Sequence, residues 1–293
     1  MSLRRISLIA PLALTVMLAA PQVGRAFYMP SASDPAYEEF KLGAVERDAS
    51  LRWGSHARPL ADSTHSFDVL HYDAHFFVPY DLPRFSAEVM ITLRVHDPLT
   101  PIELNAVGMD VDSLRLDDDT ASFAATGTIV QVLAERLDTN VTHTIHVWYQ
   151  SSILNTGIYR LDRTIYTMSE PSDARYWLIS YDEPFYKATC DIWVTAPAER
   201  LSSANGTPVD SFFTPDFTIR HWTMIYPIST YLICFNVGDF AYFNDAYIRP
   251  TPTGADTIPL NYYVHPEDTA SARAAFHRVP EMFANYERRF GRF

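Results

Sequence analysis

Apolar and polar residues alternate strictly along two stretches near the start of the chain. In the first, Leu70, Tyr72, Ala74 and Phe76 alternate with His71, Asp73 and His75. In the second, residues 85–95 carry apolar side chains at every odd position. A period of two residues is typical of a β-strand with one buried face, because successive side chains point to opposite faces of a sheet. Both stretches are therefore predicted to be half-buried strands.

Further short apolar runs follow at intervals along the chain, and polar turns separate them. The turns include Asp117-Asp118-Asp119-Thr120, Ser203-Ala204-Asn205-Gly206 and Pro250-Thr251-Pro252-Thr253-Gly254. Many short strands joined by such turns indicate a mainly β fold, an antiparallel sandwich or saddle-like domain. The runs predicted as strands are 113–116, 128–133, 143–149, 191–195, 221–226 and 231–237.

The first 26 residues have the composition of a signal peptide. Arg4 and Arg5 precede an apolar run from Ile6 to Ala20, and small residues follow at the expected cleavage region, including Ala26. The apolar run is shorter than the ~20 residues that span a bilayer, so a stable membrane anchor is not expected. The sequence predicts a secreted or periplasmic protein, with residues 27–62 as an N-terminal extension of the mature chain.

The charge of the chain argues against one class of partner. It has 35 acidic residues against 23 lysines and arginines, a formal net charge of −12. A negative surface field disfavours binding to the phosphate backbone, so nucleic acid is not expected as a partner. Only two cysteines are present, Cys190 and Cys234, too few for a disulfide scaffold. The sequence does not distinguish two free thiols from one bridge.

The period changes to that of a helix in the last thirty residues. Ala272, Phe276, Val279, Phe283 and Tyr286 are among the apolar residues that share one helical face. Asp268 is placed to cap this amphipathic helix, and Pro280 is expected to kink or restart it. We therefore predict a β-domain over residues 63–256 and the start of a second domain over residues 257–293.

One segment carries a motif. It reads Thr-Met-Ser-Glu-Pro-Ser-Asp-Ala-Arg over residues 167–175 and Tyr-Asp-Glu-Pro-Phe-Tyr-Lys-Ala-Thr over residues 181–189. The segment resembles the N-terminal β-domain of the aminopeptidase N family, in which Glu-Pro-x-x-Ala-Arg leads into Asp-Glu-Pro-x-x-Lys-Ala. Gly157-Ile158-Tyr159, Val237-Gly238-Asp239-Phe240 and Pro280-Glu281-Met282 resemble further parts of the same family. The resemblance runs from about Phe67 to the last residue.

The resemblance implies a role for Glu170. In the family, a residue at this place helps to bind the free α-ammonium group of a peptide substrate, and a carboxylate does so by charge-assisted hydrogen bonds. Without the resemblance, a surface glutamate beside a proline turn is the simpler interpretation. The other charged and turn residues of the motif are interpreted as structural: Arg175, Asp182, Glu183, Pro184 and Lys187.

The sequence departs from the family pattern in two places. Met168 stands where the family commonly has glutamine, and Ile179-Ser180 stands where it commonly has Pro-Cys. The geometry of amine binding is therefore expected to differ, whereas the fold assignment does not depend on these positions.

Zinc is the cofactor that the resemblance implies for the complete enzyme. Zinc peptidases of this kind bind the metal through His-Glu-x-x-His on a helix, and no histidine in this chain is followed by glutamate. His71, Asp73 and His75 share one face of a predicted strand, but further metal ligands are not identified, and a solvated polar face is the preferred interpretation. No catalytic residue and no metal ligand are predicted in this chain.

The predicted function is the N-terminal part of a secreted zinc metallo-aminopeptidase that acts on peptides with a free N-terminus. The catalytic domain, with the zinc site, is expected beyond residue 293, and the 293-residue chain alone is expected to be inactive. Two alternatives stay open: a noncatalytic β-sheet binding or scaffold module derived from the same family, and a family member whose catalytic site has degenerated.

Overall fold

The computed structural model describes residues 66–292 except residues 97–100, 135–136 and 154–155. The predicted signal peptide and N-terminal extension lie outside the described residues. No described helix is both long enough and apolar enough to cross a membrane. The described chain consists mainly of strands, which confirms the predicted mainly β fold.

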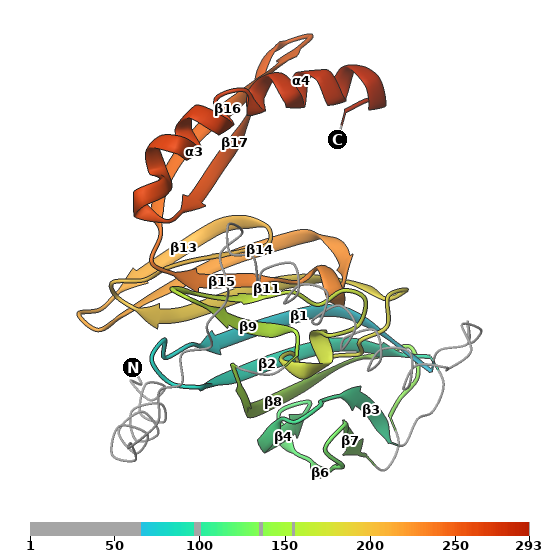
Figure 1. Cartoon of the computed structure of the whole chain (residues 1–293). Coiled ribbons are helices and arrows are strands. Elements are labelled where there is room, and N and C mark those ends of the chain that lie inside the picture. Colours follow the sequence, from blue (N-terminus) through green and yellow to red (C-terminus); the bar gives the residue numbers. More distant parts are fainter. Residues whose placement is uncertain (1–65, 97–100, 135–136, 154–155, 293) are drawn as a thin grey trace, which may run out of the picture. The chain divides into compact units, whose positions relative to one another are not determined.

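The largest element is an eight-stranded sheet (Figure 1). From one edge to the other its strands are β13 (Thr207–Phe213), β14 (Phe217–Ser229), β11 (Lys187–Pro197), β1 (Phe67–Phe77), β2 (Arg84–Val95), β8 (Thr142–Ser152), β4 (Asp110–Leu116) and β5 (Asp119–Thr120). All neighbours pair antiparallel except β1 and β11, which are parallel. The sheet is therefore mixed rather than purely antiparallel.

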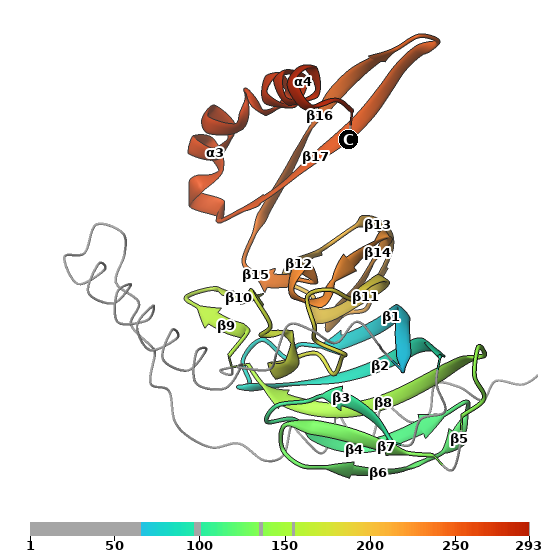
Figure 2. The same cartoon turned by 90° about the vertical axis from the view of Figure 1, so that its right-hand side faces the viewer.

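Two smaller sheets share one hydrophobic core with the large sheet. One contains β12 (Leu201–Ala204), β15 (Phe235–Gly238), β10 (Thr164–Thr167) and β9 (Ile158–Leu161), and the other contains β3 (Ile102–Asn105), β7 (Ile129–Leu133) and β6 (Ser122–Ala125). Figure 2 shows the second of these beside β4 and β8. Phe76, Tyr149, Trp177 and Phe235 are among the largest buried side chains of the core.

The alternating pattern explains which face of the large sheet is buried. In β2 the odd-numbered residues from Phe85 to Val95 are buried, and the residues between them are partly or fully exposed. In β1 the pattern breaks at one point, because a register shift between Val69 and His71 interrupts the pairing with β2. Val69 is buried in place of Leu70, which had been predicted for the buried face.

The segment predicted as a strand over residues 231–237 is only partly a strand. A 3₁₀ turn, η2 (Thr230–Leu232), occupies its beginning, and Ile233 N–H donates to the Thr230 carbonyl at 3.0 Å. Strand β15 begins at Phe235. The prediction was therefore wrong for the first residues of this run, where a local turn satisfies the backbone in place of a sheet ladder.

The C-terminal region combines a long hairpin with two helices. The hairpin contains β16 (Ala241–Thr251) and β17 (Gly254–Val264), and η3 (Pro266–Asp268) leads into α3 (Thr269–Phe276) and α4 (Val279–Phe290). Tyr262 stacks on Phe276 of α3 with ring centroids 5.1 Å apart, and Tyr247 packs on Phe283 of α4 at 5.8 Å. Aromatic contacts therefore join the helices to the hairpin.

Pro280 lies in the first turn of α4, so the helical region restarts there, as predicted. Asp268 precedes α3, but its side chain makes no capping hydrogen bond. The predicted domain boundary between residues 256 and 257 falls within β17.

Candidate functional site

The loop that carries Glu170 begins where β10 ends, and buried hydrogen bonds hold the residues that precede Glu170. The Thr167 hydroxyl accepts from the Phe235 backbone N–H at 3.0 Å, next to the pairing of β10 with β15. The buried Ser169 hydroxyl accepts a hydrogen bond from the indole N–H of Trp177 at 2.9 Å. Trp177 is itself fully buried against the rings of Phe76 and Phe235. The backbone of the loop is thus attached directly to the hydrophobic core.

Glu170 is exposed to solvent. It follows the buried Ser169 and forms a cis peptide bond with Pro171. Met168, two residues earlier, is also exposed. Burial raises the pKa of the Cys234 thiol, and the negative charge of Glu170 raises it further. Glu170 and Cys234 therefore lie near one another, although they come from distant parts of the sequence.

This arrangement has a definite chemical capability. An exposed carboxylate accepts short, charge-assisted hydrogen bonds from an alkylammonium group. Because the neighbouring residue on its N-terminal side is held by the core, the carboxylate loses little backbone freedom when it binds a cation. The loop can therefore serve as an anchor for a primary amine.

Arg175 and Asp182 form a buried ion pair next to this loop. The Arg175 Nε atom lies 3.0 Å from Oδ2 of Asp182, and the Arg175 backbone N–H donates to the same oxygen at 3.1 Å. Oδ1 of Asp182 accepts from the Thr230 hydroxyl at 2.6 Å, and the Asp182 N–H donates to Oδ1 of Asn105 at 2.9 Å. Asp182 is only 1% exposed. Through its carboxylate and its backbone N–H together, Asp182 thus contacts three other segments of the chain.

The remaining three motif residues lie in the turn before β11 and at its start. The Glu183 carbonyl accepts from the Tyr186 N–H at 3.1 Å, and the Pro184 carbonyl accepts from the Ser229 hydroxyl at 2.7 Å. Lys187 is exposed and pairs with Ser229 at the start of β11. The structure therefore brings all five predicted structural residues into one region. Their structural role stays a prediction.

The histidines of β1 contact carboxylates but do not form a metal centre. Nε2 of His75 lies 3.1 Å from Oδ1 of Asp73, and Nε2 of His71 lies 3.6 Å from Oδ2 of Asp191. Within the described ranges, no group of three or more His, Cys, Asp or Glu side chains is placed to hold a metal ion. The residues in the described part of the chain therefore do not fit a zinc site.

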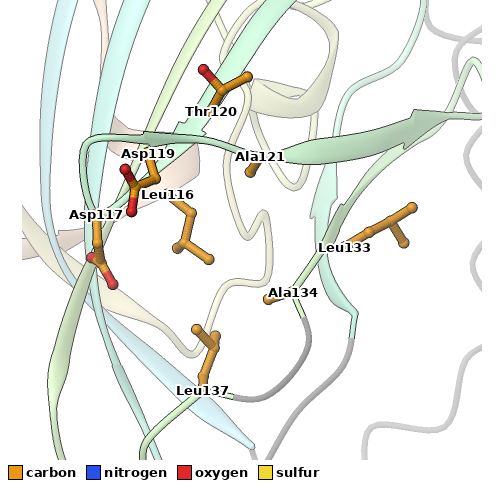
Figure 3. A pocket seen from close by; sticks show the side chains of 8 residues that line it. All are labelled: Leu116, Asp117, Asp119, Thr120, Ala121, Leu133, Ala134 and Leu137. Carbon is orange, nitrogen blue, oxygen red and sulfur yellow. The ribbon is translucent and has the colours of Figure 1, made fainter.

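A cavity of about 510 Å³ lies elsewhere, between the β4–β5 turn and the end of β7 (Figure 3). One carboxylate of its lining is already engaged: Asp117 contacts Nδ1 of His143 at 2.6 Å and accepts from the Thr144 N–H at 2.8 Å. Burial lowers the pKa of His143, but the contacts with Asp117 and with the Asp138 carbonyl outweigh it, so the pKa is raised overall. The cavity contains none of the predicted site residues. It is lined by Leu116, Asp117, Asp119, Thr120, Ala121, Leu133, Ala134 and Leu137.

Sequence reasoning missed the residues that support Glu170. Thr167, Ser169 and Trp177 lie within or beside the motif, but nothing in their spacing indicates that the serine accepts from the indole. Nothing in the sequence indicates that Cys234 lies near Glu170. The structure has both Cys190 and Cys234 as free thiols, of which Cys190 is buried.

Comparison with known proteins gives a family match and several relatives. The model of the family described as Peptidase M1 N-terminal domain matches residues 69–232. The mouse (Mus musculus) thyrotropin-releasing hormone-degrading ectoenzyme is 25% identical over 281 residues, which cover 88% of this chain and 25% of that protein. Aminopeptidase N of Acetobacter pasteurianus is 24% identical over 237 residues, 75% of this chain and 64% of that protein. The chain thus spans about a quarter of the first relative's length.

Solved structures of similar fold include an M1 zinc metallopeptidase of Deinococcus radiodurans, an E323A mutant bound to a Tyr-Ser-Ala substrate. It superposes with a TM-score of 0.69 at 23% identity and covers 77% of this chain and 54% of its own. Legionella pneumophila aminopeptidase A in complex with aspartic acid also gives 0.69, at 20% identity, covering 79% of this chain and 28% of its own. At this identity the likeness concerns the fold.

Proposed function

Since the chain belongs to the Peptidase M1 N-terminal domain family, whose complete members are zinc metallo-aminopeptidases, we propose that it is the β-domain of such an enzyme and that Glu170 binds the substrate's α-ammonium group. The observation that carries the proposal is an exposed carboxylate that follows two residues held by the core, Thr167 and Ser169. This geometry suits recognition of a peptide with a free N-terminus.

The zinc chemistry is proposed to belong to a catalytic domain that this sequence does not contain, because the described residues do not fit a zinc site. The exposed apolar residues of α4 support the proposal that another domain packs against this helix. Met282 is 50% exposed, Tyr286 61% and Phe290 79%, and no residue of α4 is buried. A helix with so many large exposed apolar side chains is typical of a surface that another domain covers.

We also propose that residues 1–26 direct the protein to secretion or to the periplasm.

The test uses the enzyme produced from the complete reading frame. Glu170→Gln keeps the size of the side chain and removes its charge. We expect the catalytic efficiency kcat/KM on aminoacyl substrates to fall about 10- to 100-fold, since a charge-assisted hydrogen bond contributes roughly 1.5–3 kcal/mol. The selectivity for free over N-acetylated substrates is expected to fall with it.

Glu199→Gln is the matched control, because Glu199 is an exposed glutamate in the connection between β11 and β12, outside the motif. It is expected to leave both quantities unchanged. Equal kinetics for Glu170→Gln and the parent enzyme on both substrate types would contradict the anchoring role. A complete reading frame without zinc ligands would instead favour the noncatalytic module or a degenerate family member.

A further inference from the structure

The face of the eight-stranded sheet that points away from the core carries a row of ionisable and aromatic residues. Strand pairing places them side by side across six strands, one from each of β13, β14, β11, β1, β2 and β8. In this order the residues are Asp210, His221, Trp193, His75, Glu88 and Trp148. The proposed peptidase function uses none of them.

Three rings of this row form a parallel stack, which we call the Trp193 stack (His75, Trp193 and His221). The Trp193 and His221 ring centroids are 3.8 Å apart with an interplanar angle of 4°. The His75 ring lies 5.0 Å from Trp193 at an angle of 8°. A protonated imidazole attracts the face of an indole ring more strongly than a neutral imidazole does, because the ring face is electronegative. The energy of the stack therefore depends on protonation of the two histidines.

Carboxylates lie within reach of the stack on the same face. Nε2 of His221 lies 3.3 Å from Oδ1 of Asp191, and Nε2 of His75 lies 3.1 Å from Oδ1 of Asp73. Nδ1 of His221 is buried and has no hydrogen-bond partner in the described part of the chain; Oδ2 of Asp210 lies 3.9 Å away. Protonation of His221 would therefore place a charge between two carboxylates, from β11 and β13.

We propose that the Trp193 stack is a pH-sensitive contact: in mildly acidic solution protonated His75 and His221 hold Trp193 between them and, with Asp73 and Asp191, tie β1, β11 and β14 together. Most side chains of this network are partly withdrawn from water; the His221 side chain is 11% exposed and that of Asp191 27%. Ion pairs and cation–π contacts at such positions are screened less than those on an open surface.

Other titratable groups surround the two histidines, and they set the acidic limit of the effect. Burial raises the pKa of Asp73, but the hydrogen bond and charge of His75 and the charge of His71 outweigh it and lower the pKa overall. The hydrogen bond from His146 lowers the pKa of Glu88, which stands next to His75. Within the described ranges, the titratable groups beside the stack include His71, Asp73, Glu88, His146, Asp191 and Asp210.

The direction of the pH dependence of stability follows from the lowered pKa values of the carboxylates. A carboxylate whose pKa is lowered in the folded state contributes stability above its unfolded pKa and loses it as the pH falls through the folded value. Imidazole charge, by contrast, is present only on the acidic side of its titration. The network is therefore fully charged only in mildly acidic solution, above the lowered folded-state pKa of Asp73.

The first measurement is fluorine NMR of the full chain labelled with 5-fluorotryptophan, with the Trp193 resonance assigned by Trp193→Phe. Between pH 8 and pH 5 this resonance is expected to shift with a sigmoidal titration. In His75→Gln/His221→Gln the shift is expected to disappear. His277→Gln is the control, because His277 is an exposed histidine at the end of α3.

The second measurement is denaturant unfolding of the same proteins. The ratio of the unfolding equilibrium constants at pH 8 and pH 5.5 is expected to be at least about tenfold larger for the parent than for the double variant. An equal ratio in parent and double variant would overturn the proposal. If the double variant does not fold, the parent alone decides, since a Trp193 resonance that does not titrate also overturns it.

Discussion

Asp182 is a single residue on which several contacts depend. Its buried carboxylate accepts from Arg175 and Thr230, and its backbone N–H donates to Asn105. A buried carboxylate is costly to desolvate, and these donors offset that cost. Removing its charge would leave the guanidinium of Arg175, which is 13% exposed, without its paired carboxylate.

We therefore expect Asp182→Asn to lower the free energy of unfolding by about 2–4 kcal/mol. The measurement is urea unfolding followed by circular dichroism. Asp216→Asn is the control, since Asp216 is exposed and, among the described residues, contributes its backbone carbonyl but not its side chain to a hydrogen bond. Equal unfolding midpoints for the two variants would show that the ion pair does not stabilise the fold.

At the scale of residues, the candidate anchor could be identified from the sequence, but its surroundings could not. Glu170 could be selected because the motif places it by order and spacing along the chain. Its proximity to Cys234 and the support from Ser169 and Trp177 depend on how β10 and β15 pair. Such contacts join segments that local patterns cannot relate to each other.

The turn between β12 and β13 shows a constraint at the scale of elements. Gly206 has a φ angle of +93°, and a Cβ atom at this position would lie 2.3 Å from the Thr223 carbonyl oxygen of β14. Both the backbone conformation and the close approach to a neighbouring strand require glycine here. A residue with a side chain can therefore replace Gly206 only if β13 and β14 move apart.

Gly206→Ala is expected to destabilise the protein by at least about 2 kcal/mol, because strain in the left-handed region adds to the clash. Gly127→Ala separates the two causes. Gly127 has a similar φ of +87°, but a Cβ atom there would meet no atom within 4 Å. Thermal unfolding of both variants measures the difference. A loss at Gly206 no larger than that at Gly127 would refute a role for the close approach.

Elements with a strong period could be predicted, and those without one could not. Strands β1 and β2 follow the two-residue alternation over most of their length. The β16–β17 hairpin was missed apart from its turn, since most of its residues are at least partly exposed and its strands contain Pro250 and Pro259. Its residues are held by cross-strand pairing and by contacts with α3 and α4, which leave little periodic signal.

For the whole molecule, the absence of a metal-holding group in the described residues leads to a direct expectation. The purified 293-residue chain should neither bind Zn²⁺ with submicromolar affinity nor hydrolyse aminoacyl substrates, because a catalytic zinc site needs three protein ligands. Calorimetry with Zn²⁺ and an aminopeptidase assay test this, with the product of the complete reading frame as the control. Zinc-dependent hydrolysis by the chain alone would contradict it.

For the whole molecule, only the fold class could be predicted from the sequence. A mainly β fold follows from the alternation and the turns, whereas the strand order does not. The central parallel pair of β1 and β11 joins two strands that are far apart in sequence, and no local pattern indicates which strands will be neighbours.

That parallel pair also has a consequence for biosynthesis. Strands β1, β2, β8, β4 and β5 are complete once the ribosome has passed Ser152, whereas β11 ends only at Pro197. Until β11 emerges, β1 is the unprotected edge of a half-formed sheet, and unpaired edges invite association with other chains. The nascent polypeptide therefore depends on rapid synthesis of β11 after β8. Synonymous codon changes that slow translation between Ser152 and Pro197 are expected to lower the yield of folded protein.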